Sequence, residues 1–293
     1  APYVGAQQKK LETGVHVLPD LAMDTTDRNR TSPFAFTGNK FEFRMLGSSA
    51  SVATPNIILN TAVAEALAQF SRELSGTAPK DMEQAVHELI KRAIKKHKKV
   101  IFNGNGYTEE WVAEAEKRGL YNLASTPDCL PQILAEKNVE LFTRHHIFTR
   151  EELASRYEIF LENYVKTVAI EAKTLREMLA KDFLPAVSRY ASSVSNEALS
   201  MKSLVPDLST ASAKKLVSFL GASYETIAGA LDLLDQEILA LDEKTSLLEA
   251  ADYCRKTVLA TMEELRSAAD QAEAKIPEEE LPYPTYDALL FSV

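Results

Sequence analysis

Cysteine is scarce in this sequence, which has only Cys129 and Cys254 among its 293 residues. Two lone thiols build neither the disulfide framework of a small secreted domain nor a cysteine-rich zinc site. Both thiols are therefore expected to be reduced and unreactive, as in a cytoplasmic protein.

Long apolar runs and an excess of positive charge are also absent. The most apolar stretch, residues 52–70, is interrupted by polar residues and a proline, so it predicts a buried helix rather than a membrane span. Lys and Arg number 33 against 42 Asp and Glu, which gives a formal net charge of −9. That sign argues against broad binding to nucleic acids or anionic membranes, because both require a positive field. A small anionic substrate is still compatible with it, because a local cluster of arginines is enough to bind one.

The rest of the composition is that of an ordinary globular protein, with 45% hydrophobic and 26% charged residues. The length suits one large domain or two small ones. Residues 14–19 and 40–46 alternate between apolar and polar side chains and predict short strands. After residue 50 the apolar spacing becomes helical. The sequence therefore predicts an α+β fold that is predominantly α-helical, with a few antiparallel strands followed by long helices.

Helix signals mark most of the chain after residue 50. Thr149 and Glu152 form a capping box before a long amphipathic helix that runs towards Leu184, where Pro185 is expected to kink or end it. The closing segment, 276–293, contains three prolines that predict a non-helical tail, and its aromatic residues predict docking on an apolar surface. The other expected helices run from 55 to about 74, from 79 into the basic run 95–99, from 108, from 126, and over roughly 209–240 and 243–275, the last two forming a hairpin or bundle.

A turn cluster, Asn103-Gly-Asn-Gly106, separates two of these helices. Its glycines invite comparison with a phosphate-binding loop, but the Gly-Lys-Ser/Thr ending of such loops is missing. We interpret the cluster as a turn, and the nearby Trp111 as a core residue rather than a platform for a ligand.

The strand over 40–46 carries an unusual concentration of charge. Its period of two places Lys40, Glu42 and Arg44 on one face, and Arg28 and Arg30 lie just upstream. One interpretation is an exposed sheet face with ion pairs. The other is an anion site, in which arginines hold carboxylate or phosphate groups and the glutamate is a ligand of Mg²⁺, as phosphoryl transfer requires.

The segment from Asn29 to Arg44 resembles the late active-site segment of glutamine synthetases. In that family an Asn-Arg-Ser-like element precedes a strand in which basic, apolar, Glu, apolar and Arg residues follow one another. The sequences of residues 25–44 and of the closing segment Leu-Pro-Tyr-Pro-Thr-Tyr are similar to those of the type III branch. The resemblance implies that residues 1–175 are the C-terminal part of the catalytic domain and that 176–293 are a helical extension.

The same resemblance implies a role for each charged residue. Glu42 is expected to bind the Mg²⁺ or Mn²⁺ that bridges the nucleotide and the γ-carboxylate, and Arg44 to hold the carboxylate of the substrate glutamate. Arg30 is expected to lie by the transferring phosphoryl group and the γ-glutamyl phosphate, as a catalytic and substrate-binding residue. Lys40 stands near the ATP phosphates, where the family usually has an arginine.

One position departs from the family pattern. Other branches place a further nucleotide-binding arginine five residues after the Asn-Arg element, and here that position is Ala35. Arg28 lies close by and is included among the expected nucleotide-binding residues.

The function implied is that of a glutamate–ammonia ligase, which phosphorylates glutamate with ATP and lets ammonia displace phosphate. The family's β-grasp domain and other metal ligands belong to earlier segments, and one carboxylate cannot assemble a two-metal site, so this chain alone is expected to be inactive. The resemblance also implies a ring-based homo-oligomer, a dodecamer. Two alternatives stay open: a ligase that attaches a larger, polyamine-type amine to glutamate, and a non-catalytic helical scaffold for oligomerisation.

Overall fold

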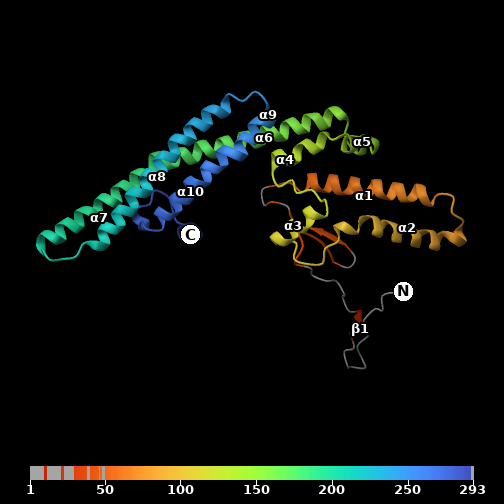
Figure 1. The fold of residues 1–293 in the computed structure, drawn as a ribbon, viewed down its shortest axis with the longest axis horizontal. Helices are drawn as coiled ribbons and strands as arrows, with labels where there is room; N and C mark the ends of the chain where they lie inside the picture. Colours follow the sequence, from red (N-terminus) through yellow and green to blue (C-terminus); the bar gives the residue numbers. More distant parts are fainter. Residues whose placement is uncertain are drawn as a thin grey trace. The chain divides into compact units, whose positions relative to one another are not determined.

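The fold is mostly helical and falls into two compact units, Ala1–Asn122 and Leu123–Val293, which are described separately below. The strands are short and antiparallel, which confirms the predicted fold class. The computed structural model (Figure 1) describes residues 10–11, 21–22, 30–37, 40–45, 47 and 50–291.

Two strand pairs open the first unit. They are β1 (Lys10–Leu11) with β2 (Leu21–Ala22), and β3 (Phe34–Phe36) with β4 (Phe41–Phe43), both antiparallel. Strand β4 is the centre of the strand predicted over 40–46. The strand predicted over 14–19 lies outside the described residues.

The helices of the first unit begin and end close to where the sequence predicted. They are α1 (Ala53–Leu74), the 3₁₀ turn η1 (Pro79–Asp81), α2 (Met82–His97), the 3₁₀ turn η2 (Lys98–Val100) and α3 (Glu109–Lys117). Helices α1 and α2 contact one another as an antiparallel pair (Figure 1). Both leave apolar side chains exposed, namely Ile58, Val63, Leu67, Ile90 and Ile94. These two helices therefore present apolar surface that the described part of the unit does not cover.

The second unit is a bundle of long helices. Its elements are α4 (Thr126–Cys129), η3 (Leu130–Leu134), α5 (Glu136–Arg144), α6 (Arg150–Met178), η4 (Leu179–Phe183), α7 (Leu184–Leu204), α8 (Ala211–Asp242), α9 (Leu247–Tyr253), η5 (Cys254–Val258), α10 (Leu259–Glu273), η6 (Glu278–Glu280) and α11 (Tyr286–Phe291). Helices α6, α7, α8 and α10 enclose one core (Figure 1) whose fully buried members include Leu220, Ile227, Leu234, Val258 and Leu265. The predicted pair of long helices is present as α8 and the run from α9 to α10.

The long helix after Thr149 shows both a confirmed cap and an unpredicted turn. The Glu152 N–H donates to Thr149 Oγ1 at 3.2 Å and the Thr149 N–H donates to Glu152 Oε2 at 2.8 Å, which completes the capping box. Near Pro185 the helical run does not end. It passes through a π-helical turn, η4, and continues as α7, because such a turn accommodates a residue that lacks an N–H.

The compact units divide between residues 122 and 123, whereas the predicted domain boundary lay between 175 and 176. That boundary falls inside α6, and buried residues on both sides of it, such as Ala172 and Leu179, belong to one core. Compactness and family domains are different criteria, so the division into catalytic part and extension stays a prediction.

The prediction of a wholly non-helical tail was wrong. Pro284 is the last proline, and after it the chain forms α11, because nothing further blocks helical hydrogen bonds. The predicted docking of the tail is present only in part: Ile276 and Leu281 pack against the bundle core, whereas Phe291 and its neighbours Leu289 and Leu290 are exposed. The Tyr283 hydroxyl lies 2.9 Å from both Met178 O and Asp182 Oδ2 at the π turn. Partial burial, with the hydrogen bond to Asp182, raises the pKa of this hydroxyl.

Replacing Tyr283 with phenylalanine is expected to destabilise the second unit by about 1 to 2 kcal/mol, because it removes a hydrogen bond to a carboxylate. Thermal and denaturant unfolding followed by circular dichroism measure the change. Tyr190→Phe is the control, since that hydroxyl on α7 bonds no other described residue. Equal stability of the two variants would contradict a role for the tail hydrogen bond.

Both cysteines are free thiols. Cys129 is exposed, while burial raises the pKa of the Cys254 thiol to about 11, so that thiol is protonated at neutral pH. Among the residues that the structure describes, no helix has the length and apolar composition needed to cross a bilayer.

Candidate functional site

The β3–β4 hairpin carries the charged residues that the sequence singled out. Its register pairs Phe34 with Phe43, Ala35 with Glu42 and Phe36 with Phe41. One further backbone hydrogen bond extends the ladder at each end, from Arg44 N to Pro33 O at 2.8 Å and from Thr37 N to Lys40 O at 2.9 Å. Paired residues of an antiparallel ladder share a face, so Glu42 shares its face with Ala35.

Glu42 lies between two cations. Its carboxylate accepts hydrogen bonds from Arg44 Nε at 3.1 Å and Arg44 Nη2 at 2.6 Å, and Lys40 Nζ lies 3.6 Å away. The hydrogen bonds from Arg44 hold the pKa of the Glu42 carboxyl below its usual value. Arg44 and Glu42 are about one third exposed and Lys40 about two thirds, so all three side chains are accessible to a ligand.

The opposite face of the hairpin is aromatic and open. Ring centroids of Phe34 and Phe41 lie 5.3 Å apart, and those of Phe36 and Phe41 lie 5.0 Å apart. All four phenylalanines of the two strands are exposed, and Phe41 reaches 64%. On the charged face, in contrast, Ala35 and Thr37 are buried. The buried residues Ala35 and Thr37 thus lie on the face that carries the charges, whereas the described residues leave the aromatic face uncovered.

Arg30 lies at the end of the hairpin that also holds Arg44. It precedes Pro33 by three residues, and the Pro33 carbonyl accepts the Arg44 N–H. Its side chain is exposed, and none of the described residues forms an ion pair or hydrogen bond with its guanidinium. Arg28 lies outside the described residues. The structure therefore brings Lys40, Glu42 and Arg44 together on one face and places Arg30 at the end of the hairpin that holds Arg44.

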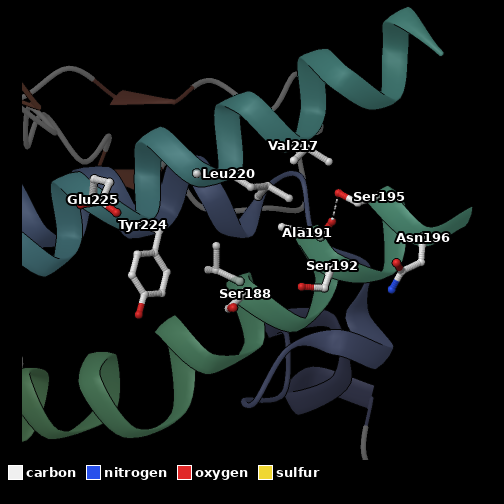
Figure 2. Close-up of a pocket in the computed structure, with 11 residues that line it drawn as sticks. Ser188, Ala191, Ser192, Ser195, Asn196, Val217, Leu220, Tyr224 and Glu225 are labelled. Carbon is white, nitrogen blue, oxygen red and sulfur yellow. Dashed lines mark hydrogen bonds between the residues drawn. The ribbon is translucent and has the colours of Figure 1, made fainter. Parts of the chain in front are cut away.

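A groove in the second unit is the main alternative location for a site. It lies between α7 and α8, has a volume of about 410 Å³, and is lined by small and mostly uncharged side chains (Figure 2). Ser195 Oγ donates to Ala191 O at 2.8 Å and is thereby occupied within its own helix (Figure 2). Glu225 is the one charged side chain in the lining. The groove contains none of the predicted site residues and no cluster of groups suited to catalysis.

Comparison with known proteins identifies relatives of this chain. The glutamine synthetase C-terminal domain family matches residues 85–202. A glutamine synthetase of Butyrivibrio fibrisolvens is 45% identical over 271 residues, which are 92% of this chain and 38% of that protein. The chain is a homologue of the C-terminal region of glutamine synthetases.

Two further relatives support this, and one of them is named as a type-3 enzyme. A type-3 glutamine synthetase of Dictyostelium discoideum is 37% identical over 290 residues, 96% of this chain and 39% of that protein. A glutamine synthetase of Bacteroides fragilis (strain YCH46) is 31% identical over 292 residues, 98% of this chain and 40% of that protein. The chain therefore spans about two fifths of the length of the curated relatives it matches, and the last alignment includes the β3–β4 hairpin.

The position of Ala35 in this glutamine synthetase homologue has a clear geometric meaning. Ala35 faces Glu42 directly across the hairpin and is fully buried. An arginine there would bring a third cation to the charged face beside Glu42, and alanine removes it.

Divalent metal ions are general in the family, and the described residues fit one part of such a site. Glu42 supplies a carboxylate of the kind that Mg²⁺ and Mn²⁺ bind. Within the described ranges no group of three His, Cys, Asp or Glu side chains is arranged to hold a metal ion. Glu42 thus fits as a single ligand, and the other donors must come from elsewhere.

The structure also shows a contact at the site that the sequence did not predict. The Gly106 N–H donates to the Thr31 carbonyl at 2.6 Å, beside Arg30. The signal available in the sequence was the glycine itself, since glycine is typical of positions where two backbones approach closely.

Proposed function

We propose that this chain supplies the C-terminal strip of the active site of a glutamate–ammonia ligase. The observation that carries the proposal is the charged face of β3–β4, where Glu42 lies between Lys40 and Arg44, and Arg44 is at the end of the hairpin next to Arg30. Homology over nearly the whole chain supports the same conclusion. The complete ligase would phosphorylate the γ-carboxylate of glutamate with ATP and let ammonia displace the phosphate.

Each charged residue has a role that its chemistry suits. The Arg44 guanidinium, whose Nε and Nη2 donate to Glu42 in the structure, is assigned to the carboxylate of the substrate glutamate, which would take the place of Glu42 on these nitrogens. Arg30 has an exposed guanidinium free to stabilise negative charge on the transferring phosphoryl group. Lys40 and Arg28 are assigned to the phosphates of ATP. Glu42 is assigned to Mg²⁺ or Mn²⁺, which when bound neutralises charge on the phosphoryl oxygens.

This strip is one part of a composite site. The described residues contribute a single carboxylate to the metal, and the relatives are about two and a half times as long as the chain. The open aromatic face of the hairpin and the exposed apolar side chains of α1 and α2 are surfaces for further segments or subunits. We propose a ring-based homo-oligomer, a dodecamer in the cytoplasm, in which the second unit takes part in subunit contacts.

One observation favours a different function. Glu42 forms ion pairs within the hairpin, as a purely structural charged face would. On that view the chain is a helical scaffold for oligomerisation, and the hairpin takes no part in catalysis.

Activity measurements distinguish these functions. The isolated 293-residue chain is expected to form no glutamine from glutamate, ammonia and ATP, while a ligase of full family length containing this segment is expected to be active. Phosphate release with ammonia is compared with phosphate release with polyamines, and the product is identified by mass spectrometry. Glutamine formation by the isolated chain would refute the composite site. Faster phosphate release with a polyamine than with ammonia would support the alternative, a ligase that attaches a larger amine to glutamate.

A further inference from the structure

The turn cluster at residues 103–106 lies against the segment that carries Arg30. The Gly106 N–H donates to the Thr31 carbonyl at 2.6 Å. A Cβ atom at Gly106 would lie 3.2 Å from Thr31 O and 3.3 Å from the Cδ of Pro33. The two backbones therefore approach so closely that a side chain larger than hydrogen requires a shift of one of them.

The turn itself is fixed by short-range hydrogen bonds. The Tyr107 N–H donates to Asn105 Oδ1 at 3.1 Å, which closes a turn around Gly106. The Thr108 hydroxyl donates to the Asn105 carbonyl at 3.0 Å and leads into α3. Gly106 thus sits between residues whose backbone conformation is held on both sides.

Aromatic stacking and one arginine hold the start of this loop on α3. The rings of Phe102 and Trp111 stack with centroids 4.2 Å apart, and the Arg118 guanidinium lies over both rings. Arg118 also donates to the carbonyl of Ile101 at 2.9 Å and to Glu114 at 2.7 Å. The loop is therefore attached to a small rigid framework, and Trp111 is a packing residue of it.

We propose that Gly106 is a positioning residue for Arg30 in the ligase reaction. Two backbone hydrogen bonds hold the segment from Arg30 to Pro33: Gly106 binds Thr31 from one side, and Arg44 binds Pro33 from the other. Together they fix where Arg30 starts relative to Arg44 and Glu42. The Gly106 N–H is occupied by the Thr31 carbonyl, so Gly106 acts through this backbone contact and its N–H is not available to a phosphate. This inference rests on the proposed role of Arg30.

Gly106→Ala in a ligase of full family length is expected to lower kcat by about ten-fold, because small misplacements of a catalytic group have large effects on rate. The KM for glutamate is expected to change less than kcat, since Arg44 keeps its own ladder position. Gly47→Ala adds the same methyl group in the same unit, where the nearest atom among the described residues is Ala50 Cβ at 4.0 Å, and it is expected to keep full activity. Arg118→Gln weakens the framework without touching Thr31 and is expected to lower kcat as well, by less than Gly106→Ala.

A double-mutant cycle with Arg30→Lys separates positioning from general stability. If Gly106 acts through Arg30, adding Gly106→Ala to Arg30→Lys has little further effect on kcat. The proposal would be overturned if the effects of Gly106→Ala and Arg30→Lys on kcat multiply independently. It would also be overturned if the Gly106→Ala enzyme has a lower melting temperature at unchanged kcat. Full activity of Arg30→Lys and Arg30→Ala would instead overturn the proposed role of Arg30 itself.

Discussion

Replacing Glu42 with alanine in a ligase of full family length is expected to lower metal-dependent turnover by about a hundred-fold or more, at a nearly unchanged melting temperature. The loss is large because the metal bound by this carboxylate stabilises negative charge in the transition state by several kcal/mol. Each 1.36 kcal/mol of lost transition-state stabilisation lowers the rate about ten-fold. The melting temperature changes little because the ion pairs of Glu42 with Arg44 and Lys40 are partly exposed, and exposed pairs contribute little to stability.

The measurement is turnover against Mg²⁺ or Mn²⁺ concentration, together with thermal unfolding. Glu73→Ala is the matched control, since Glu73 also pairs with an arginine, Arg92, in the first unit but lies on α1. That variant is expected to keep its turnover and its metal dependence. A Glu42→Ala enzyme that unfolds at lower temperature yet retains its dependence on metal would support the scaffold function instead.

The parts of the fold that were predictable from the sequence are those fixed by near neighbours in the chain. The alternation from Lys40 to Arg44 predicted the two faces of β4, because successive side chains of a strand point to opposite faces of the sheet. Thr149 and Glu152 marked the start of α6 through a capping box that needs only four residues. Such signals depend on local geometry, and tertiary packing did not overrule them.

Other features depend on distant parts of the chain and have no local signal. The π turns η4 and η5 lie where the long helices pack on the bundle core, and only Pro185 hinted at the first. The hydrogen bond from Gly106 to Thr31 joins a loop to a segment before β3, and spacing along the sequence gives no measure of that approach. Helix α11 was not predicted, because the three prolines of the tail disfavour helix. It begins after the last of them, where that restriction no longer applies.

The candidate site divides in the same way. Charge alternation alone predicted a face with Lys40, Glu42 and Arg44, and both an ion-paired surface and an active-site strip share that geometry. The assignment of glutamate, ATP and metal to individual residues came from family resemblance, which no contact in the described residues tests. This is why the decisive measurement concerns metal dependence and not the ion pairs themselves.

The second large effect is expected in the core of the helical bundle, at the pair Glu237 and Thr261. Glu237 on α8 is 6% exposed, and its Oε1 accepts the Thr261 hydroxyl of α10 at 2.8 Å. Its Oε2 is buried and receives no hydrogen bond from a described residue. The carboxyl group thus depends on a single donor inside an otherwise apolar interface between two helices.

Thr261→Val keeps the shape of the side chain and removes that donor, so it is expected to destabilise the second unit by about 3 kcal/mol. Adding Glu237→Met in the same chain removes the buried carboxyl as well and is expected to restore most of the loss, because an apolar pair at this position has no polar group left unsatisfied.

Thr226→Val, on the exposed side of α8, is the control and is expected to stay within about 0.5 kcal/mol of the parent. Guanidinium unfolding of the parent and the three variants, followed by circular dichroism, measures these differences in stability. A double variant as unstable as Thr261→Val alone would mean that the cost arises from packing of the valine and not from the isolated carboxyl of Glu237.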